Sequence, residues 1–290
     1  MKQKNRQFGR KSMTLPVRDR RPLGRQLALL LPLLLLLLAG GCARSPWTEP
    51  VDDERHRQLL AAYDDHRRQA AQCGDAYDGD LNLSWRTSVD SVALAGYYQI
   101  QHPASVRFNV TNPLGQPLVA VAVATGGFQV LHVPRQTFYA GSIRSYALRH
   151  DVPPALLSGP LFDWLTGRPI AGGVRVADIR EDKQERGVWY ALVRDGKNRT
   201  LPIEHLLLDP ATGQVVERVV VDDQDEQHAR ISYDDWQPAG NCRLPLVVTI
   251  TGISFWAEAE LRFSEVLPAR LSPADFKLPV PSGYLRQFMP

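Results

Sequence analysis

Apolar and polar side chains alternate with a period of two residues along much of this chain, and this pattern restricts its fold more than any other feature. Val106, Phe108 and Val110 alternate with polar neighbours, and residues 255–263 repeat the pattern. Such alternation is typical of a strand with one buried face. Short turns separate further segments of strand character, and serial strands of this kind favour an antiparallel sheet over a parallel α/β sheet. These segments are 81–86, 92–101, 117–125, 128–133, 136–140, 187–194, 203–208, 215–222, 228–234 and 244–251.

Two segments break the strand rhythm. Residues 51–73 are polar but place Leu59, Leu60 and Tyr63 on one side, which predicts an amphipathic helix lying across the sheet. Residues 153–167 are apolar and compact, and their prolines and glycines keep any helix short. This segment is either a lid or an ordinary plug of core. The sequence therefore predicts one mainly antiparallel β domain with a few helices on it.

The first 41 residues have the pattern of a secretory signal. Residues 1–26 contain nine Lys/Arg and one Asp. Residues 27–38 are all apolar: ten are leucine, and the other two are Ala28 and Pro32. A bilayer core needs about 20 helical residues, so this run is too short to span comfortably. Translation starts at Met1 or at Met13, and the pattern does not decide between them.

The signal ends in Leu38-Ala39-Gly40-Gly41-Cys42, which resembles the bacterial lipobox. In that motif a peptidase cuts before the cysteine, whose thiol then carries lipid. The alternative is an ordinary signal followed by a coincidental cysteine. We expect residues 1–41 to be a lipoprotein signal peptide, 42–50 a lipidated tether and 51–290 the folded domain. Ala43 in place of aspartate favours the outer membrane, with the domain facing the periplasm.

Charge and cysteine content restrict what the mature domain does. Residues 42–290 contain 25 Lys/Arg and 30 Asp/Glu, so the basicity of the chain belongs to its leader. The composition of the mature domain therefore gives no support for nucleic-acid binding, which needs a basic surface. Cys73 and Cys242 would lie in an oxidising compartment. They either form a disulfide that ties the N-terminal segment to a late strand, or remain two separate thiols.

No catalytic or metal-binding motif is present. The seven histidines are scattered without ligand spacing, and neither a zinc-protease motif, a Cys-x-x-Cys pair nor a nucleophile elbow occurs. The acidic residues at 222–226 are typical of a hairpin turn. We therefore expect no catalytic residue, no metal and no cofactor, and predict a protein that is not an enzyme.

Some strands are apolar on both faces. In residues 117–124, Leu118, Ala120 and Ala122 alternate with valines, and residues 188–193 are apolar throughout. In a half-closed barrel one face of such a strand meets the interior and the other a covering helix. Small interior residues leave room for a ligand chain. A filled core is the alternative.

Three segments carry a resemblance to a known family. Thr111-Asn112-Pro113-Leu114-Gly115 between two apolar strands, and Leu161 to Pro169 with its Leu-x-x-Trp-x-x-Gly-x-Pro pattern, resemble the LolB family of outer-membrane lipoprotein receptors. Phe276 to Gly283 is similar to the ending of LolA-like lipoproteins. The resemblance implies an incomplete, half-closed antiparallel barrel of eleven strands. An N-terminal amphipathic helix and a short helical lid would enclose an apolar cavity.

The resemblance also implies a function and a set of site residues. The cavity receives acyl chains of lipoproteins from a LolA-like periplasmic carrier, and the protein releases them into the outer membrane. Leu114, presented by Pro113 at a turn, would contact the membrane. The cavity and lid candidates are Leu118, Ala120, Ala122, Leu161, Trp164 and Leu165. The alternative is an envelope lipoprotein of the same fold that binds a protein partner and transports nothing.

Overall fold

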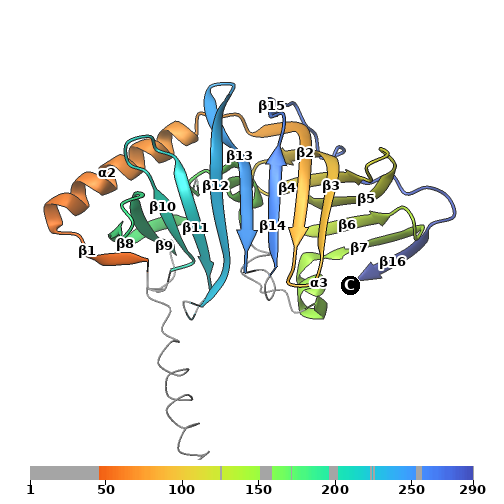
Figure 1. Cartoon of the computed structure of the whole chain (residues 1–290), viewed down its shortest axis with the longest axis horizontal. Helices are drawn as coiled ribbons and strands as arrows, with labels where there is room; N and C mark the ends of the chain where they lie inside the picture. Colours follow the sequence, from red (N-terminus) through yellow and green to blue (C-terminus); the bar gives the residue numbers. More distant parts are fainter. Residues whose placement is uncertain are drawn as a thin grey trace, which may run out of the picture. The chain divides into compact units, whose positions relative to one another are not determined.

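The structure is a computed structural model, and it describes residues 46–124, 126–150, 159–170, 172–195, 202–222, 224, 226–252 and 257–289. Residues 46–290 form one compact unit. Sixteen described strands form a single sheet that does not close on itself (Figure 1). Neighbouring strands are antiparallel, except that β16 runs parallel to β7. This confirms the predicted fold class, a mainly antiparallel incomplete barrel.

The strands follow each other across the sheet in the order β1-β8-β9-β10-β11-β12-β13-β14-β2-β3-β4-β5-β6-β7-β16, and β15 pairs with β2 beside this path. Their bounds are β1 Trp47–Pro50, β2 Ala76–Arg86, β3 Ser91–Gln101, β4 Ser105–Thr111, β5 Pro117–Ala124, β6 Gly127–His132, β7 Thr137–Ser142, β8 Val174–Asp182, β9 Val188–Arg194, β10 Glu204–Leu208, β11 Val215–Val221, β12 Gln227–Ala239, β13 Cys242–Thr251, β14 Glu258–Phe263, β15 Leu267–Pro268 and β16 Leu285–Met289.

The sheet has more strands than the eleven that the family resemblance implies. The strands β1, β8, β15 and β16 lie outside the segments expected from the sequence. In β8 a bulge shifts the register between Val176 and Asp178, which breaks the period-two pattern. The other three strands have five residues or fewer, too few for alternation to show.

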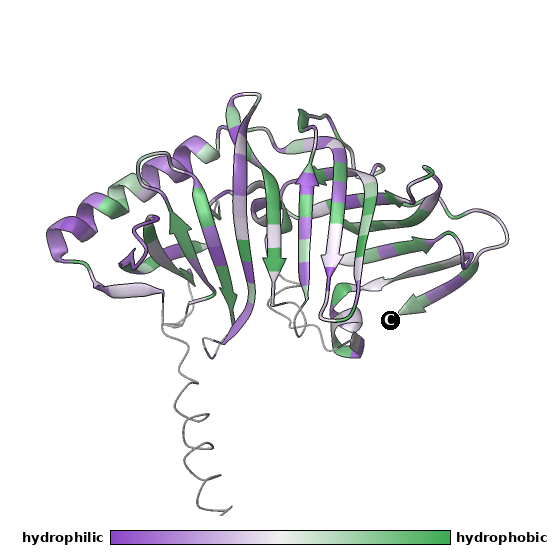
Figure 2. Ribbon diagram, viewed as in Figure 1, coloured by the Kyte–Doolittle hydropathy of each residue, from purple (hydrophilic) through white to green (hydrophobic). Residues whose placement is uncertain are grey.

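Three described helices accompany the sheet: α2 Asp53–Ala70, α3 Ile143–His150 and α5 Leu161–Thr166. The helix α2 is the one predicted over 51–73. It begins where the Asp52 side chain accepts a hydrogen bond from the Arg55 N–H, at 2.8 Å. Acidic residues in its first turn and arginines in its last complement the helix dipole. Figure 2 shows α2 as mainly hydrophilic, so it is held by a narrow apolar stripe.

That stripe packs on the sheet at β9. Leu59 and Tyr63 are the buried residues of α2. The Tyr63 ring stacks on Tyr190 with centroids 4.9 Å apart, and the Tyr190 hydroxyl donates to the Leu59 carbonyl at 3.2 Å. Both helix residues belong to the main apolar core, which also contains Phe162, Trp164 and Leu165 of α5. Thus α2 and α5 pack on the same face of the sheet.

The strands that are apolar on both faces are covered differently from the expectation. On β9, α2 covers the face toward the main core, and a smaller cluster around Trp189 with Trp47 occupies the opposite face. On β5, the covering element is an extended segment near the C-terminus that includes Leu278 and Val280, instead of a helix. The chain therefore covers part of its own sheet with a segment that has no regular structure.

Candidate functional site

An apolar cavity of about 220 Å³ lies between α5 and two groups of strands. One wall comes from β4 and β5, the other from β12, β13 and β14, and α5 contributes the remainder. Every lining residue is apolar: Val106, Phe108, Val121, Val123, Leu161, Trp164, Leu165, Ile231, Ile250 and Leu261. A cavity without polar groups stays dry, and a cavity of about 150 Å³ already admits a small apolar molecule.

The structure brings three of the predicted cavity residues together. Leu161, Trp164 and Leu165 all line this cavity from α5. The helix ends at Gly167, whose φ of +66° is left-handed. A Cβ at this position would lie 2.6 Å from the Trp236 ring. Both conditions demand glycine, which explains its place in the Leu-x-x-Trp-x-x-Gly-x-Pro segment.

On β5 the alanines predicted from the sequence lie on the other face. Val121 and Val123 line the cavity, whereas Ala120 and Ala122 pack in a second cluster beneath the segment that contains Leu278. Leu118 is the extra residue of a bulge in β5, so alternation does not assign a face to its side chain. The predicted alanines therefore do not line this cavity. Both faces of β5 are apolar, and alternation alone cannot say which one points inward.

A buried ion pair holds the end of α5 against the sheet. The Arg218 side chain of β11 is fully buried, and its Nη1 lies 3.0 Å from both carboxylate oxygens of Glu204 on β10. Its Nη2 donates to the Arg168 carbonyl just beyond α5, at 2.5 Å. The Tyr233 hydroxyl donates to the Trp164 carbonyl at 2.8 Å. These bonds fix the C-terminal end of α5 to the sheet, so this part of the cavity wall is held in place. The sequence analysis did not predict these bonds. The signal for them was the presence of Glu204 and Arg218 inside otherwise apolar strands, where a charge needs a partner.

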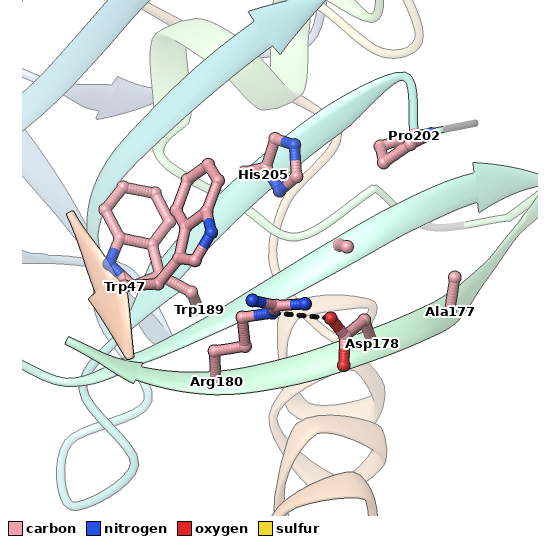
Figure 3. A pocket seen from close by; sticks show the side chains of 8 residues that line it. Trp47, Ala177, Asp178, Arg180, Trp189, Pro202 and His205 are labelled. Carbon is pink, nitrogen blue, oxygen red and sulfur yellow. Dashed lines mark hydrogen bonds and ion pairs between the residues drawn. The ribbon is translucent and has the colours of Figure 1, made fainter. Parts of the chain in front are cut away.

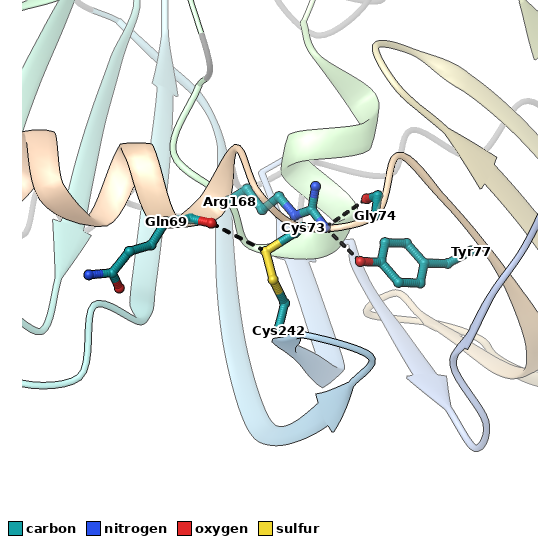
Figure 4. Close-up of a disulfide and its surroundings, with 6 residues drawn as sticks. All are labelled: Gln69, Cys73, Gly74, Tyr77, Arg168 and Cys242. Carbon is teal, nitrogen blue, oxygen red and sulfur yellow. Dashed lines mark hydrogen bonds between the residues drawn. A yellow bond between two sulfur atoms is a disulfide. The ribbon is translucent and has the colours of Figure 1, made fainter.

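A second clamp joins α5 to the end of α2. The Arg168 guanidinium donates to the Gly74 carbonyl at 2.9 Å and to the Tyr77 hydroxyl at 2.7 Å (Figure 4). Next to Gly74, Cys73 forms a disulfide with Cys242 at the start of β13, with Cα atoms 5.7 Å apart. Of the two alternatives for these cysteines, the structure has the disulfide, which links the end of α2 to a late strand.

Asp163 of α5 is buried beside this network and makes the stability of the protein depend on pH. Burial raises the pKa of its carboxyl from the ordinary 3.8 to about 6, against the opposing effect of Arg218. The folded state then binds the proton more tightly than the unfolded state. Stability is therefore full below about pH 4 and is lost as the pH rises through about 6.

We expect Asp163→Asn to remove this dependence. The rise of the Asp163 pKa from 3.8 to about 6 corresponds to roughly 3 kcal/mol of stability between these limits. Urea unfolding of the parent and the variant at about pH 4.5 and about pH 7 would measure it. The parent should lose stability toward pH 7 relative to the variant, and parallel pH profiles would contradict the assignment. Asp53→Asn, an exposed carboxylate in the first turn of α2, is the matched control.

Leu114 lies at the tip of the turn between β4 and β5. The Asn112 side chain accepts from the N–H groups of Leu114 and Gln116, at 2.9 and 3.0 Å. Gly115 takes a φ of +76°, which suits glycine. This turn leaves Leu114 83% exposed, while Pro113 beside it is also exposed. The geometry presents an apolar side chain to the surroundings.

Cys42, Met1 and Met13 fall outside the described residues. In the described part of the chain, no helix is both long and apolar enough to cross a bilayer. No cluster of three or more His, Cys, Asp or Glu side chains suited to a metal ion occurs among those residues either.

Comparison with known proteins identifies the fold. No protein-family profile matches the sequence, and no curated protein sequence matches it. A LolA superfamily protein from Nitrosomonas europaea superposes with a TM-score of 0.52 at 10% identity, over 74% of this chain and 97% of that chain. A candidate outer membrane lipoprotein-sorting domain from Vibrio parahaemolyticus gives 0.52 at 10% identity, over 76% and 96%. A DUF1329 family protein from Desulfovibrio piger gives 0.50 at 10% identity, over 75% and 96%. The chain therefore has the LolA/LolB-like fold that its sequence motifs indicate.

Proposed function

We propose that this chain is a lipoprotein of the outer membrane, anchored through Cys42, that accepts acyl chains of other lipoproteins and releases them into that membrane. The observation that carries the proposal is the apolar cavity beside α5, lined by ten apolar residues. Solved proteins of the same fold include a candidate outer membrane lipoprotein-sorting domain. A LolA-like periplasmic carrier would deliver the cargo. Transfer between successively better apolar sites requires no catalytic group.

The size of the cavity limits what it holds. Its volume of about 220 Å³ lies below the roughly 300–1,000 Å³ of sites for drug-sized ligands. The cavity as it stands accepts part of one acyl chain. The C-terminal end of α5 is fixed by Arg218 and Tyr233. A wider opening would therefore come from the strand walls.

Displacement of a fluorescent apolar probe tests the proposal. The chain with Cys42→Ala, which removes the lipidated thiol, is loaded with the probe and titrated with a diacylated lipopeptide or with the same peptide unacylated. We expect displacement by the acylated form alone. Val121→Phe, which fills the cavity, should reduce probe binding about 10-fold, while Val119→Phe, on the same strand and face but outside the lining, should not.

The outcome also separates the two functions. No probe uptake, or equal displacement by both peptides, would mean that the interior is a filled core. The alternative, an envelope lipoprotein that binds a protein partner on the same fold, would then replace the transfer function. Probe binding that is insensitive to Val121→Phe would show that the ligand occupies another site.

A further inference from the structure

A second hollow, of about 320 Å³, lies on the opposite face of the sheet near β1 (Figure 3). It involves neither α5 nor the acyl cavity. Its volume falls within the range of small-molecule sites. Unlike the apolar cavity, it combines aromatic rings with charged side chains. Its lining consists of Trp47, Ala177, Asp178, Arg180, Trp189, Ala191, Pro202 and His205.

The bulge in β8 places the charged residues on this face. Val176 lies opposite Leu192, which points into the main core, but Asp178 lies opposite Ala191. The extra residue, Ala177, reverses the alternation. Without the bulge, Asp178 and Arg180 would point into the apolar core, where unpaired charges are costly. The bulge therefore moves the pair out of the core and into the hollow.

The small side chain of Ala191 creates the space. Ala191 on β9 lies between two cross-strand neighbours, Asp178 on β8 and His205 on β10. The next row along the strands contains Arg180 beside Trp189. A methyl group surrounded by large side chains leaves a depression at its own position. A leucine there would fill it.

The aromatic side of the hollow is rigidly built. The Trp47 ring stacks on His205 with centroids 4.5 Å apart, and it meets Trp189 edge to face at 5.5 Å. Trp189 is fixed further because its Nε1–H donates to Asp182 at 2.8 Å. Trp47 is the partly exposed member of the three. An indole held in this way needs no reordering to receive a ligand.

The charges of the hollow balance. The Arg180 Nε donates to the Asp178 carboxylate at 2.6 Å. The pair carries no net charge, so neither an anion nor a cation gains a net attraction from it. A neutral ligand keeps the pair intact and still finds a donor and an acceptor side by side. Adjacent hydroxyl groups match both, since each hydroxyl donates and accepts.

We propose that this hollow binds a neutral saccharide, with one pyranose ring against Trp47 and adjacent hydroxyls on Asp178 and Arg180. The C–H groups on one face of a pyranose carry partial positive charge and suit the electron-rich face of an indole. The proposal does not depend on the acyl-transfer function, because the two sites lie on opposite faces and share no residue.

Saturation-transfer NMR on the full chain in phospholipid nanodiscs tests the proposal. The probes are two neutral saccharides, diacetylchitobiose and maltotriose, with inorganic phosphate and phosphocholine as charged comparisons. We expect signals from the ring protons of at least one saccharide, and no competition by phosphate or phosphocholine. Absence of binding by both saccharides, or their displacement by either charged probe, would overturn the proposal.

Variants locate the binding. Ala191→Leu, which fills the hollow, should weaken saccharide binding by about 10-fold or more, whereas Ala93→Leu, at an exposed strand position, should not. Because Ala191 is buried, thermal unfolding must first show that the variant folds. If it does not, Asp178→Asn, at a partly exposed site, replaces it and should weaken binding by removing the charged acceptor. Unchanged binding in the folded variant would contradict the site.

Discussion

Replacing Arg218 with methionine is expected to lower the free energy of unfolding by about 3–5 kcal/mol. The guanidinium is fully buried, and the Glu204 carboxylate that it neutralises is 2% exposed. Methionine removes the positive charge and leaves the carboxylate buried without a partner. It also removes the donor to the Arg168 carbonyl, so the end of α5 loses one of its bonds to the sheet. Urea unfolding at neutral pH measures the loss.

Two further variants show whether the loss comes from the stranded charge. The double variant Arg218→Met with Glu204→Met should recover most of the stability, because an apolar pair avoids the desolvation of both charges. Arg57→Met removes an exposed partner of Glu54 on α2, and should change stability by no more than about 1 kcal/mol. If Arg218→Met cost no more than this exposed control, the ion pair would not hold α5.

Leu114→Glu is expected to leave acyl-chain binding intact but to slow release into membranes by about 10-fold or more. Burying a leucine side chain contributes about 1.5–3 kcal/mol, and each 1.4 kcal/mol is a factor of ten. A carboxylate at the tip of the turn cannot make that contribution. Stability should not change, because Leu114 is 83% exposed and its turn is held by the Asn112 side chain.

Release is measured with a fluorescent diacylated lipopeptide bound to the chain, mixed with phospholipid vesicles that carry a quencher. Leu148→Glu is the matched control, since Leu148 is also a leucine at the surface, 73% exposed, but lies on α3 away from the β4–β5 turn. Slow release by both variants would point to a general effect of charge. Normal release by Leu114→Glu would remove the membrane-contact role of this turn.

Most of the strands and the main helix could be predicted from local sequence because their signals are local. Val106, Phe108 and Val110 alternate with polar residues, and β4 contains them. The predicted helix over 51–73 is α2, whose cap and apolar stripe are neighbours in the sequence. The segment around Trp164 could be predicted as a lid or a plug of core because its apolar residues cluster within a few positions.

What lies across the sheet could not be predicted in this way. Both faces of β5 are apolar, so only the packed structure shows that Val121 lines the cavity while Ala122 lies beneath the C-terminal segment. The bulge at Ala177 decides which face receives Asp178, and the break that it leaves in the alternation does not say which face is buried.

Local spacing of side chains specifies most elements of this protein: antiparallel strands, an amphipathic helix, a short apolar helix and an exposed leucine turn. Each depends on side chains a few residues apart, whose spacing follows from strand and helix geometry. Which elements meet depends instead on how distant segments pack. Glu204 meets Arg218, and Gly74 meets Arg168, through pairing and packing of segments far apart in the chain. Contacts of that kind depend on register and on which face is covered, and a period of two residues specifies neither.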